Sequence, residues 1–197
     1  MFGPRIEGQG GVSLRPPTLE DYVLFGEWML QPEVGRFWGP RFGEITRENA
    51  EKRFKESGDS ATSVSWSIAH QGETVGFCGL FDIDVVSRDA ESGIFIGRHD
   101  LYGHGIASEA VRLRTAFAWY ELGLRRVHNW IGLKNVGSRR ANEKAGYRQM
   151  GILPRVFFRS GEWYDGWLGE AFPETFPTDA VPAPWSGNKA GDGLGPR

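Results

Sequence analysis

Two glycines, separated by one residue, stand directly before a helix-like segment of this chain. Gly103 and Gly105 flank His104 in the stretch HDLYGHGIASEAVRL, residues 99–113. The first N–H groups of a helix lack partners within the helix, and the helix dipole adds about half a positive charge there. Glycine also lets a ligand approach the backbone closely, because it has no Cβ. The stretch therefore indicates either a phosphate-binding turn or a tight turn that only requires a positive φ.

Phosphate loops with a side-chain signature fit this stretch poorly. The P-loop pattern, with its Gly-Lys-Ser/Thr ending, is absent from the sequence. The dinucleotide fingerprint needs a third glycine where Ser108 stands and an acidic residue about 20 positions later, where Glu121 is the only acid. A phosphate would therefore be bound by backbone N–H groups, to which Ile106, Ala107 and Ser108 add theirs as the helix begins.

Metal and disulfide chemistry are not expected. His70, His99, His104 and His128 are scattered along the chain without the spacing of metal ligands. Cys78 is the only cysteine, which excludes an intramolecular disulfide and argues against a cysteine metal site. His104 either contacts the phosphate or faces solvent as an ordinary loop residue.

A helix follows the two glycines, and an apolar strand lies on either side of it. The apolar side chains recur at a spacing of four, three, four, three and four residues, at Ile106, Ala110, Leu113, Phe117, Tyr120 and Leu124. Gly123 suits the C-terminal end of this helix. Strands are predicted over 90–97 and 125–133. Because the connection between them contains a helix, we expect these two strands to pair in parallel.

The remaining elements complete one domain over residues 11–172. Further strands are predicted at 12–15, 64–70, 73–83 and, as a hairpin turning at Ser160-Gly161, over 148–169. Helices are predicted at 18–30, 44–57 and 135–147, with Thr18, Thr46 and Asn135 as N-caps. The fold class is α/β (α+β), with a single mixed, mostly antiparallel sheet of six to seven strands and helices on both faces. Residues 1–10 are predicted to form an N-terminal extension, and the Pro/Gly-rich residues 173–197 an irregular or disordered tail.

Composition is that of an ordinary globular chain. Of 197 residues, 40% are hydrophobic and 24% charged. A net charge of −2 gives no electrostatic argument for binding nucleic acid. No apolar run approaches the roughly 18 residues that span a bilayer, and the N-terminus has no signal-peptide pattern. We expect a cytoplasmic monomer or homodimer without nucleic-acid or membrane partners.

Four blocks of the sequence, in order, resemble one enzyme family. LRPPTLEDYVLFGEWMLQPEV, ESGIFIGRHDLYGHGIASEAVRL, NVGSRRANEKAGY and RSGEWYDGWLG resemble the opening strand and helix, the acetyl-CoA motif, the Asn-x-x-Ser helix and the closing hairpin of GNAT N-acetyltransferases. The branch is the one that acetylates ribosomal-protein N-termini and related amines, and the similarity covers roughly residues 11–170. Tyr102 stands where that family usually has Gln or Arg, so the side-chain contact of those residues is not expected here.

The resemblance implies a GNAT-like fold, acetyl-CoA as donor, a primary amine as acceptor and no metal. The cofactor-binding residues that it implies are Phe95, Ile96, Gly97, Tyr102, Gly103, His104, Gly105, Ile106, Ala107, Ser108, Asn135, Ser138, Arg139 and Lys144. The pyrophosphate would lie on the N–H groups of the glycine turn, and Asn135 would hold the pantetheine arm between the strands at 90–97 and 125–133. N–H groups near Phe95 to Gly97 would bind the thioester carbonyl and stabilise its developing charge.

Two further residues have roles implied by the resemblance. Glu91 is the candidate general base, with Asp82 and Asp84 as alternatives; the other interpretation of Glu91 is a solvated strand-edge carboxylate. Ser138 is the candidate acid or contact for the leaving thiol, unless it serves only the start of its helix.

A tyrosine acid is a third possibility for the leaving thiol. In some relatives a tyrosine has this role, but its position is Asn142 here. Tyr147 or Tyr164 would have to reach the site instead.

The acceptor is left open by the sequence. A protein N-terminus, an aminoglycoside-like antibiotic, a polyamine and an amino-sugar all remain. A polycation would be favoured by the acids Asp82, Asp84, Asp89 and Glu91. The aromatic residues Trp28, Phe37, Trp38 and Phe42 either line an acceptor pocket or pack in the core. The alternative function is a non-catalytic acyl-CoA-binding sensor or scaffold.

Overall fold

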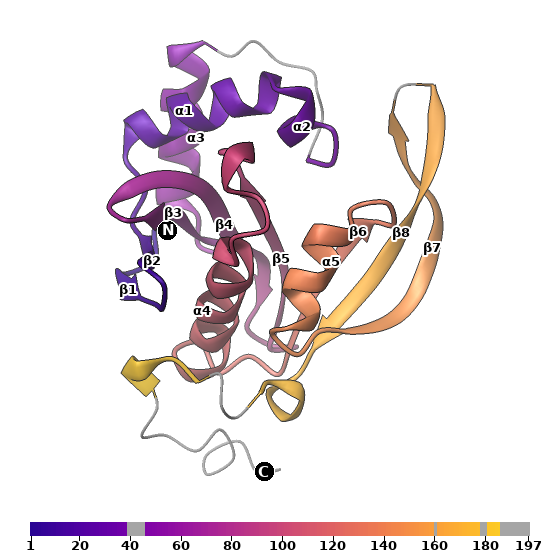
Figure 1. Ribbon diagram of the computed structural model, residues 1–197. Helices are drawn as coiled ribbons and strands as arrows, with labels where there is room; N and C mark the ends of the chain where they lie inside the picture. The colour runs from indigo at the N-terminus through magenta and orange to yellow at the C-terminus, as the bar shows by residue number, and fades with distance from the viewer. Residues whose placement is uncertain (39–45, 160, 178–180, 186–197) are drawn as a thin grey trace.

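The chain forms one mixed sheet covered by helices on both faces (Figure 1). The structure is a computed structural model and describes residues 1–38, 46–159, 161–177 and 181–185. Within these residues the sheet has eight strands in the order β1-β2-β3-β4-β5-β6-β8-β7. The strands are β1 (Ile6–Glu7), β2 (Val12–Arg15), β3 (Val64–His70), β4 (Glu73–Asp84), β5 (Asp89–Ile96), β6 (Arg126–Gly132), β7 (Arg148–Arg159) and β8 (Glu162–Ala171).

Strand pairing confirms the predicted sheet type and corrects its size. β5 and β6 pair in parallel, and every other neighbouring pair of the described strands is antiparallel. The sheet has eight strands rather than six to seven, because Ile6–Glu7 adds β1 beside β2. A strand of two residues is too short to show a periodic pattern, so it was not predicted within residues 1–10.

The helices divide between the two faces of the sheet. They are α1 (Leu19–Leu30), α2 (Pro32–Gly35), α3 (Arg47–Asp59), α4 (Ile106–Tyr120) and α5 (Val136–Glu143). On one face α1 packs on β4 and on α3, whereas α4 packs on β2, β4 and β5 from the other face and carries α5 beside it (Figure 1). The predicted caps are confirmed: Thr18, Thr46 and Asn135 each accept a hydrogen bond from a first-turn N–H.

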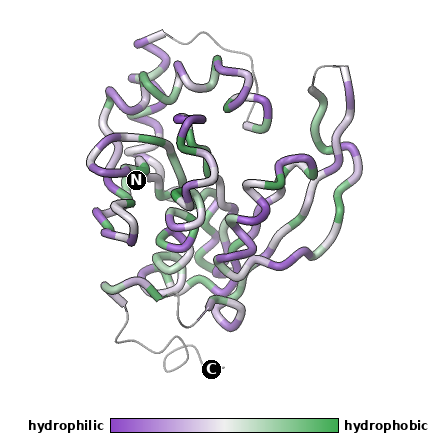
Figure 2. The backbone as a smooth tube through the Cα atoms, in the orientation of Figure 1, coloured by the Kyte–Doolittle hydropathy of each residue, from purple (hydrophilic) through white to green (hydrophobic). Residues whose placement is uncertain are grey.

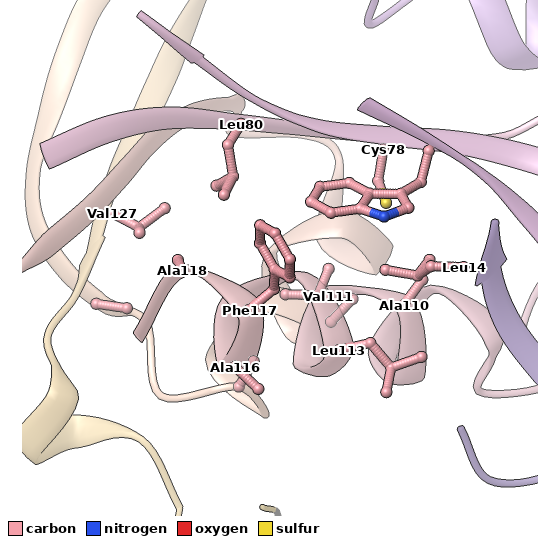
Figure 3. Close-up of a cluster of buried hydrophobic side chains, with 14 of the residues drawn as sticks. Leu14, Cys78, Leu80, Ala110, Val111, Leu113, Ala116, Phe117, Ala118 and Val127 are labelled. Carbon is pink, nitrogen blue, oxygen red and sulfur yellow. The ribbon is translucent and has the colours of Figure 1, made fainter. Parts of the chain in front are cut away.

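The main hydrophobic core lies between α4 and the sheet. Figure 3 shows Val111 and Phe117 pointing from α4 toward Cys78 and Leu80 on the sheet. Figure 2 shows hydrophobic residues concentrated in this central region, while the outer helix turns are mostly hydrophilic. Ring centroids of Trp66 and Phe117 lie 5.0 Å apart in an edge-to-face contact. The predicted apolar seam of α4 is therefore the side that fixes this helix on the sheet.

Part of the Pro/Gly-rich C-terminal segment is attached to the domain. Short 3-10 helices lie at Pro173–Thr175 and Ala183–Trp185. The Trp185 ring stacks on Tyr120 with centroids 5.9 Å apart, and its Nε1 donates to Glu121 Oε1 at 2.7 Å. These contacts join the described part of the segment to the C-terminal end of α4.

A buried carboxylate ties α1 to β2, β3 and β4. Asp21 accepts hydrogen bonds from Arg15 at 2.7 and 2.8 Å, from Thr74 Oγ1 at 2.7 Å and from Ser67 Oγ at 2.8 Å. Burial alone raises the pKa of Asp21, but these bonds and one from the Thr18 N–H outweigh it and lower the pKa to about 2. The ionised carboxylate is therefore part of the fold.

Asp21→Asn is expected to lower the free energy of unfolding at pH 7 by about 3 kcal/mol, because Arg15 loses its buried partner. The folded pKa is depressed, so this stabilisation is fully present above the pKa of an unfolded aspartate, about 3.9. It is lost as the pH falls toward 2. Urea unfolding at pH 7 and near pH 2 measures both effects. Glu20→Gln, on an exposed acid of the same helix, is the control. Equal stability of Asp21→Asn and the wild type at pH 7 would contradict this role.

Candidate active site

The parallel strands β5 and β6 separate part-way along their length. They pair only over Asp89–Glu91 and Arg126–His128, although β5 continues to Ile96 and β6 to Gly132. The two halves of the sheet diverge toward the top of the view in Figure 1. Beyond Glu91 and His128, backbone groups of each strand face the other across an opening, which we call the strand gap.

The register decides which amides face the strand gap. The Gly97 N–H donates to Val75 O at 2.8 Å, on the β4 side. Because successive residues of a strand point their backbone groups to opposite edges, the Phe95 amide also faces β4 and the Ile96 amide faces the gap. Of the three residues expected to bind a thioester carbonyl, only Ile96 therefore presents its N–H to the gap. The N–H of Ile94 points the same way.

The two glycines before α4 both adopt left-handed backbone conformations. Gly103 has φ 85° and Gly105, the N-cap of α4, has φ 82°. No side chain caps this end of α4 among the described residues, and a Cβ added at either glycine would meet nothing within 4 Å. The turn therefore leaves the N–H groups of Ile106, Ala107 and Ser108 beside open space. A phosphate site needs backbone N–H groups without partners and open space beside them, and this turn provides both.

The side chains of the turn divide between core and solvent. Ile106 is buried in the main core and Ala107 packs against it, so both contribute only backbone groups. Tyr102 folds back, and its hydroxyl donates to Ile96 O at 3.1 Å. His104 is exposed at the turn, where it either contacts a bound phosphate or faces solvent. Tyr102 thus links the turn to the end of β5.

The first turn of α5 brings Asn135, Ser138 and Arg139 beside α4. Asn135 Oδ1 caps the helix by accepting from the Ser138 N–H at 3.3 Å. The Ser138 hydroxyl makes no hydrogen bond to the described residues. The backbone carbonyl of Ser138 accepts a hydrogen bond from Asn142 Nδ2 at 2.8 Å. The Nε of Arg139 is buried without a partner among them, while Lys144 is exposed at the other end of the helix. Arg139 thus keeps a buried donor for a ligand, whereas Lys144 offers only an exposed charge.

Glu91 and His128 lie at the point where the strands separate. They are register partners on the parallel strands, and Phe81 is the partner of Glu91 on β4. Burial raises the pKa of Glu91 above its usual range, His128 opposes this shift and Asp82 adds to it. The Nδ1 atom of His128 is buried without a hydrogen-bond partner among the described residues. A half-buried carboxylate with a raised pKa at this place is suited to accept a proton.

A buried polar network under the strand gap was not predicted from the sequence. Arg114 of α4 is fully buried and donates to Gly93 O at 2.8 Å, to Ser92 Oγ at 3.2 Å and to Tyr147 OH at 3.3 Å. Asn129 Nδ2 donates to Ser92 Oγ at 3.1 Å and to Asn142 Oδ1 at 2.9 Å. The only sign of this network in the sequence is Arg114 itself, a charged residue that lies one helical turn after Ala110 beside the apolar seam of α4.

Of the predicted site residues, Glu91 and the Ile96 amide lie at the strand gap, and Tyr102 connects the glycine turn to Ile96. The amides of Phe95 and Gly97 face β4 instead, and Lys144 lies at the far end of α5. Phe42 lies outside the described residues. In the described part of the chain, no three metal-ligating side chains come together and no helix has the length and hydropathy to cross a bilayer.

The family model described as Acetyltransferase (GNAT) domain matches residues 12–148, and the chain belongs to this family. Its enzyme class is therefore that of the acetyl-CoA-dependent N-acetyltransferases, within the branch related to the ribosomal-protein enzymes.

Two relatives agree with this assignment, and one solved structure shares the fold. "Probable N-acetyltransferase YjcK" of Bacillus subtilis (strain 168) is 36% identical over 102 residues, which cover 49% of this chain and 54% of that relative. "Putative ribosomal N-acetyltransferase YdaF" of the same organism is 26% identical over 160 residues, covering 81% and 84%. The structure of spermidine N-acetyltransferase from Vibrio cholerae, in complex with CoA and spermine, aligns with a TM-score of 0.76 at 17% identity and covers 84% of this chain and 97% of its own.

Gly105→Val is expected to weaken CoA binding by about tenfold or more. A β-branched residue is strained at φ 82°, and its side chain would occupy the open space beside the α4 N–H groups. Calorimetric titration of CoA measures the change. Gly72→Val is the matched control, because Gly72 has φ 87° and equally open surroundings in the β3–β4 turn. An unchanged affinity in Gly105→Val would mean that the phosphates bind elsewhere.

Proposed function

We propose that the chain transfers an acetyl group from acetyl-CoA to a primary amine by direct attack within a ternary complex. The observation that carries this proposal is the N-terminus of α4, which no side chain of the described residues caps and which two left-handed glycines precede in the turn between β5 and α4. The CoA pyrophosphate binds the N–H groups of Ile106 to Ser108, and the pantetheine arm lies in the strand gap. Arg139 and Lys144 add positive charge for the phosphates, and Asn135 holds a pantetheine amide.

The Ile96 amide is the donor for the thioester carbonyl in this proposal. Its direction into the strand gap supports the role, as does the neighbouring Ile94 amide. When the amine nitrogen bonds to the carbonyl carbon, the oxygen gains negative charge, which a fixed N–H group stabilises.

Glu91 serves as the general base. An amine attacks only when neutral, and an α-amine with a pKa near 7.7–8.0 needs less help than a lysine-like amine near 10.4. The ammonium passes its proton to the Glu91 carboxylate, and the C–N bond then forms at the acetyl carbon. Asp84 is less suited, because its carboxylate already accepts bonds from Val86, Ser87 N–H and Ser87 Oγ.

The leaving thiolate needs a proton as the C–S bond breaks. Ser138 Oγ is one candidate donor, since it has no other partner among the described residues. Tyr147 is a second candidate donor, and the hydrogen bonds around its hydroxyl support this role. Ser92 Oγ accepts from Arg114 and Asn129, which fills its two lone pairs, so its own proton goes to Tyr147 OH at 3.1 Å. Tyr147 accepts that proton and one from Arg114, which leaves the tyrosine proton without an acceptor within the described part of the chain.

Two measurements test the proposed function. Calorimetry with acetyl-CoA tests the donor, and release of free thiol across a panel of primary amines tests the transfer. Binding together with turnover of at least one amine is the expected result. Binding without any turnover would instead favour a sensor or scaffold, and no binding would contradict the assignment of the donor.

Glu91→Gln is expected to lower kcat/KM at pH 7 by about a hundredfold, the usual contribution of a general base. The pKa of Glu91 is raised, so the wild-type rate should fall on the acid side at a pH above the usual range of a glutamate. The variant should lose that limb of the pH profile and keep its affinity for CoA. Asp84→Asn is the control. A full rate at every pH in Glu91→Gln would exclude it as the base.

A further inference from the structure

Two of the four acids that favoured a polycationic acceptor are bound to other groups of the protein. Asp84 accepts three hydrogen bonds from its own turn, and Asp89 pairs with Arg126 Nη2 at 2.5 Å. Of the five acids on β4 and β5, Glu73 lies beside Arg98 at 3.5 Å, and only Glu91 and Asp82 make no such contact within the described residues. They interact electrostatically with each other and so mark one place for a cation. The other carboxylates of these strands are paired with Arg98 or Arg126 or accept hydrogen bonds within their own turn, so they are less available to further ammonium groups.

Aromatic side chains frame the same carboxylate. Glu91, Gly93 and Phe95 alternate along β5 and therefore share one face, toward α1. Trp38 and Phe81 converge over Gly93, where an added Cβ would lie 2.6 Å from Trp38 Cη2 and 3.1 Å from Phe81 Cε2. Glycine at position 93 is thus required by the close approach of Trp38.

The segment after α2 crosses from one strand to the other. Trp38 lies on β5, with ring centroids 5.2 Å from Phe95. Its neighbour Phe37 lies on β6, because an added Cβ at Gly132 would be 3.1 Å from the Phe37 ring. On the face of the sheet opposite α4, aromatic rings therefore border the strand gap.

The charge at this border opposes a second ammonium group. The Arg36 guanidinium lies 4.9 Å from the centre of the Phe37 ring. Arg36 directly follows α2, and Glu33 is an exposed acid of that helix. Burial raises the pKa of Tyr102, Arg36 lowers it and Glu33 raises it. A ligand that extends outward past Phe37 meets aromatic surface and a cation rather than an acidic groove.

We propose that the acceptor is a primary amine with a single positive charge on an apolar body. The ammonium group lies at Glu91, and the apolar body contacts Trp38 and Phe37, whose ring faces also favour one cation. This inference rests on the proposed acetyl transfer, because it assigns the acceptor of that same site. The shared chemistry has two sources, a small alkyl or arylalkyl amine and a peptide N-terminus with an apolar first residue.

Hexylamine and 1,6-diaminohexane test the charge requirement directly, because they differ only by a terminal ammonium group. The expected kcat/KM for hexylamine is at least about tenfold higher, since the second ammonium would be desolvated without a partner. An equal or higher value for the diamine, or a preference for spermidine over 2-phenylethylamine, would overturn the inference alone. Absence of turnover with every amine would overturn the proposed function as well.

Trp38→Ala tests the aromatic frame. The KM for hexylamine should rise about tenfold, because its apolar body loses a contact surface. The KM for the diamine should rise less, because its second ammonium group already weakens the contact of the same chain with Trp38. Trp163→Ala is the matched control: Trp163 is exposed on β8 and packs on Phe158. Affinity for CoA confirms that each variant is folded, and Trp38→Leu should restore part of the preference. An unchanged ratio in Trp38→Ala would overturn the role of this residue.

A pair of peptides separates the two sources of the amine. Phe-Ala-Ala-amide should be acetylated at least about tenfold faster than Ser-Ala-Ala-amide at equal concentration if the apolar body is a first side chain. Turnover of hexylamine with neither peptide accepted supports a small-molecule acceptor. A preference for the serine peptide over the phenylalanine peptide and over hexylamine would overturn the requirement for an apolar body.

Discussion

The parallel pairing of β5 and β6 ends after three residue pairs, and the candidate site depends on that separation. Beyond it, the amides of Ile94 and Ile96 lie at a strand edge without a strand partner. A buried amide left unpaired costs about 1–3 kcal/mol, so such an edge in the middle of a sheet favours a ligand that supplies hydrogen bonds. The pantetheine arm of CoA, which carries amide groups along its length, meets that requirement.

The same separation explains the positions of the other groups. The seam of α4 fixes this helix beneath the sheet, so its uncapped N-terminus stands at the open end of the gap. At the opposite end of the strand gap, β5 and β6 are joined on the α4 side. Asn129 of β6 and Arg114 of α4 both donate hydrogen bonds to Ser92 Oγ of β5. Glu91 lies above that point on the other face. In the proposed function, the donor and the acceptor enter this one opening from different sides.

Local signals in the sequence predicted the elements well, and long-range contacts limited the rest. Thr18 and Thr46 are helix caps because capping depends on residues three positions apart. The parallel pair followed from the strand–helix–strand order. Which amide faces the gap depends on the register with β4, so Ile96 could not be separated from Phe95 and Gly97. The partners of Asp89 and Arg114 lie at least 20 residues away and leave no local pattern.

A crystal structure of the protein in complex with CoA tests the central claim most directly. The account predicts the pyrophosphate within hydrogen-bond distance of the N–H groups of Ile106 to Ser108. It also predicts the pantetheine arm in the strand gap, with its sulfur on the Glu91 side. A CoA molecule bound elsewhere, with β5 and β6 joined along their full length, would contradict it.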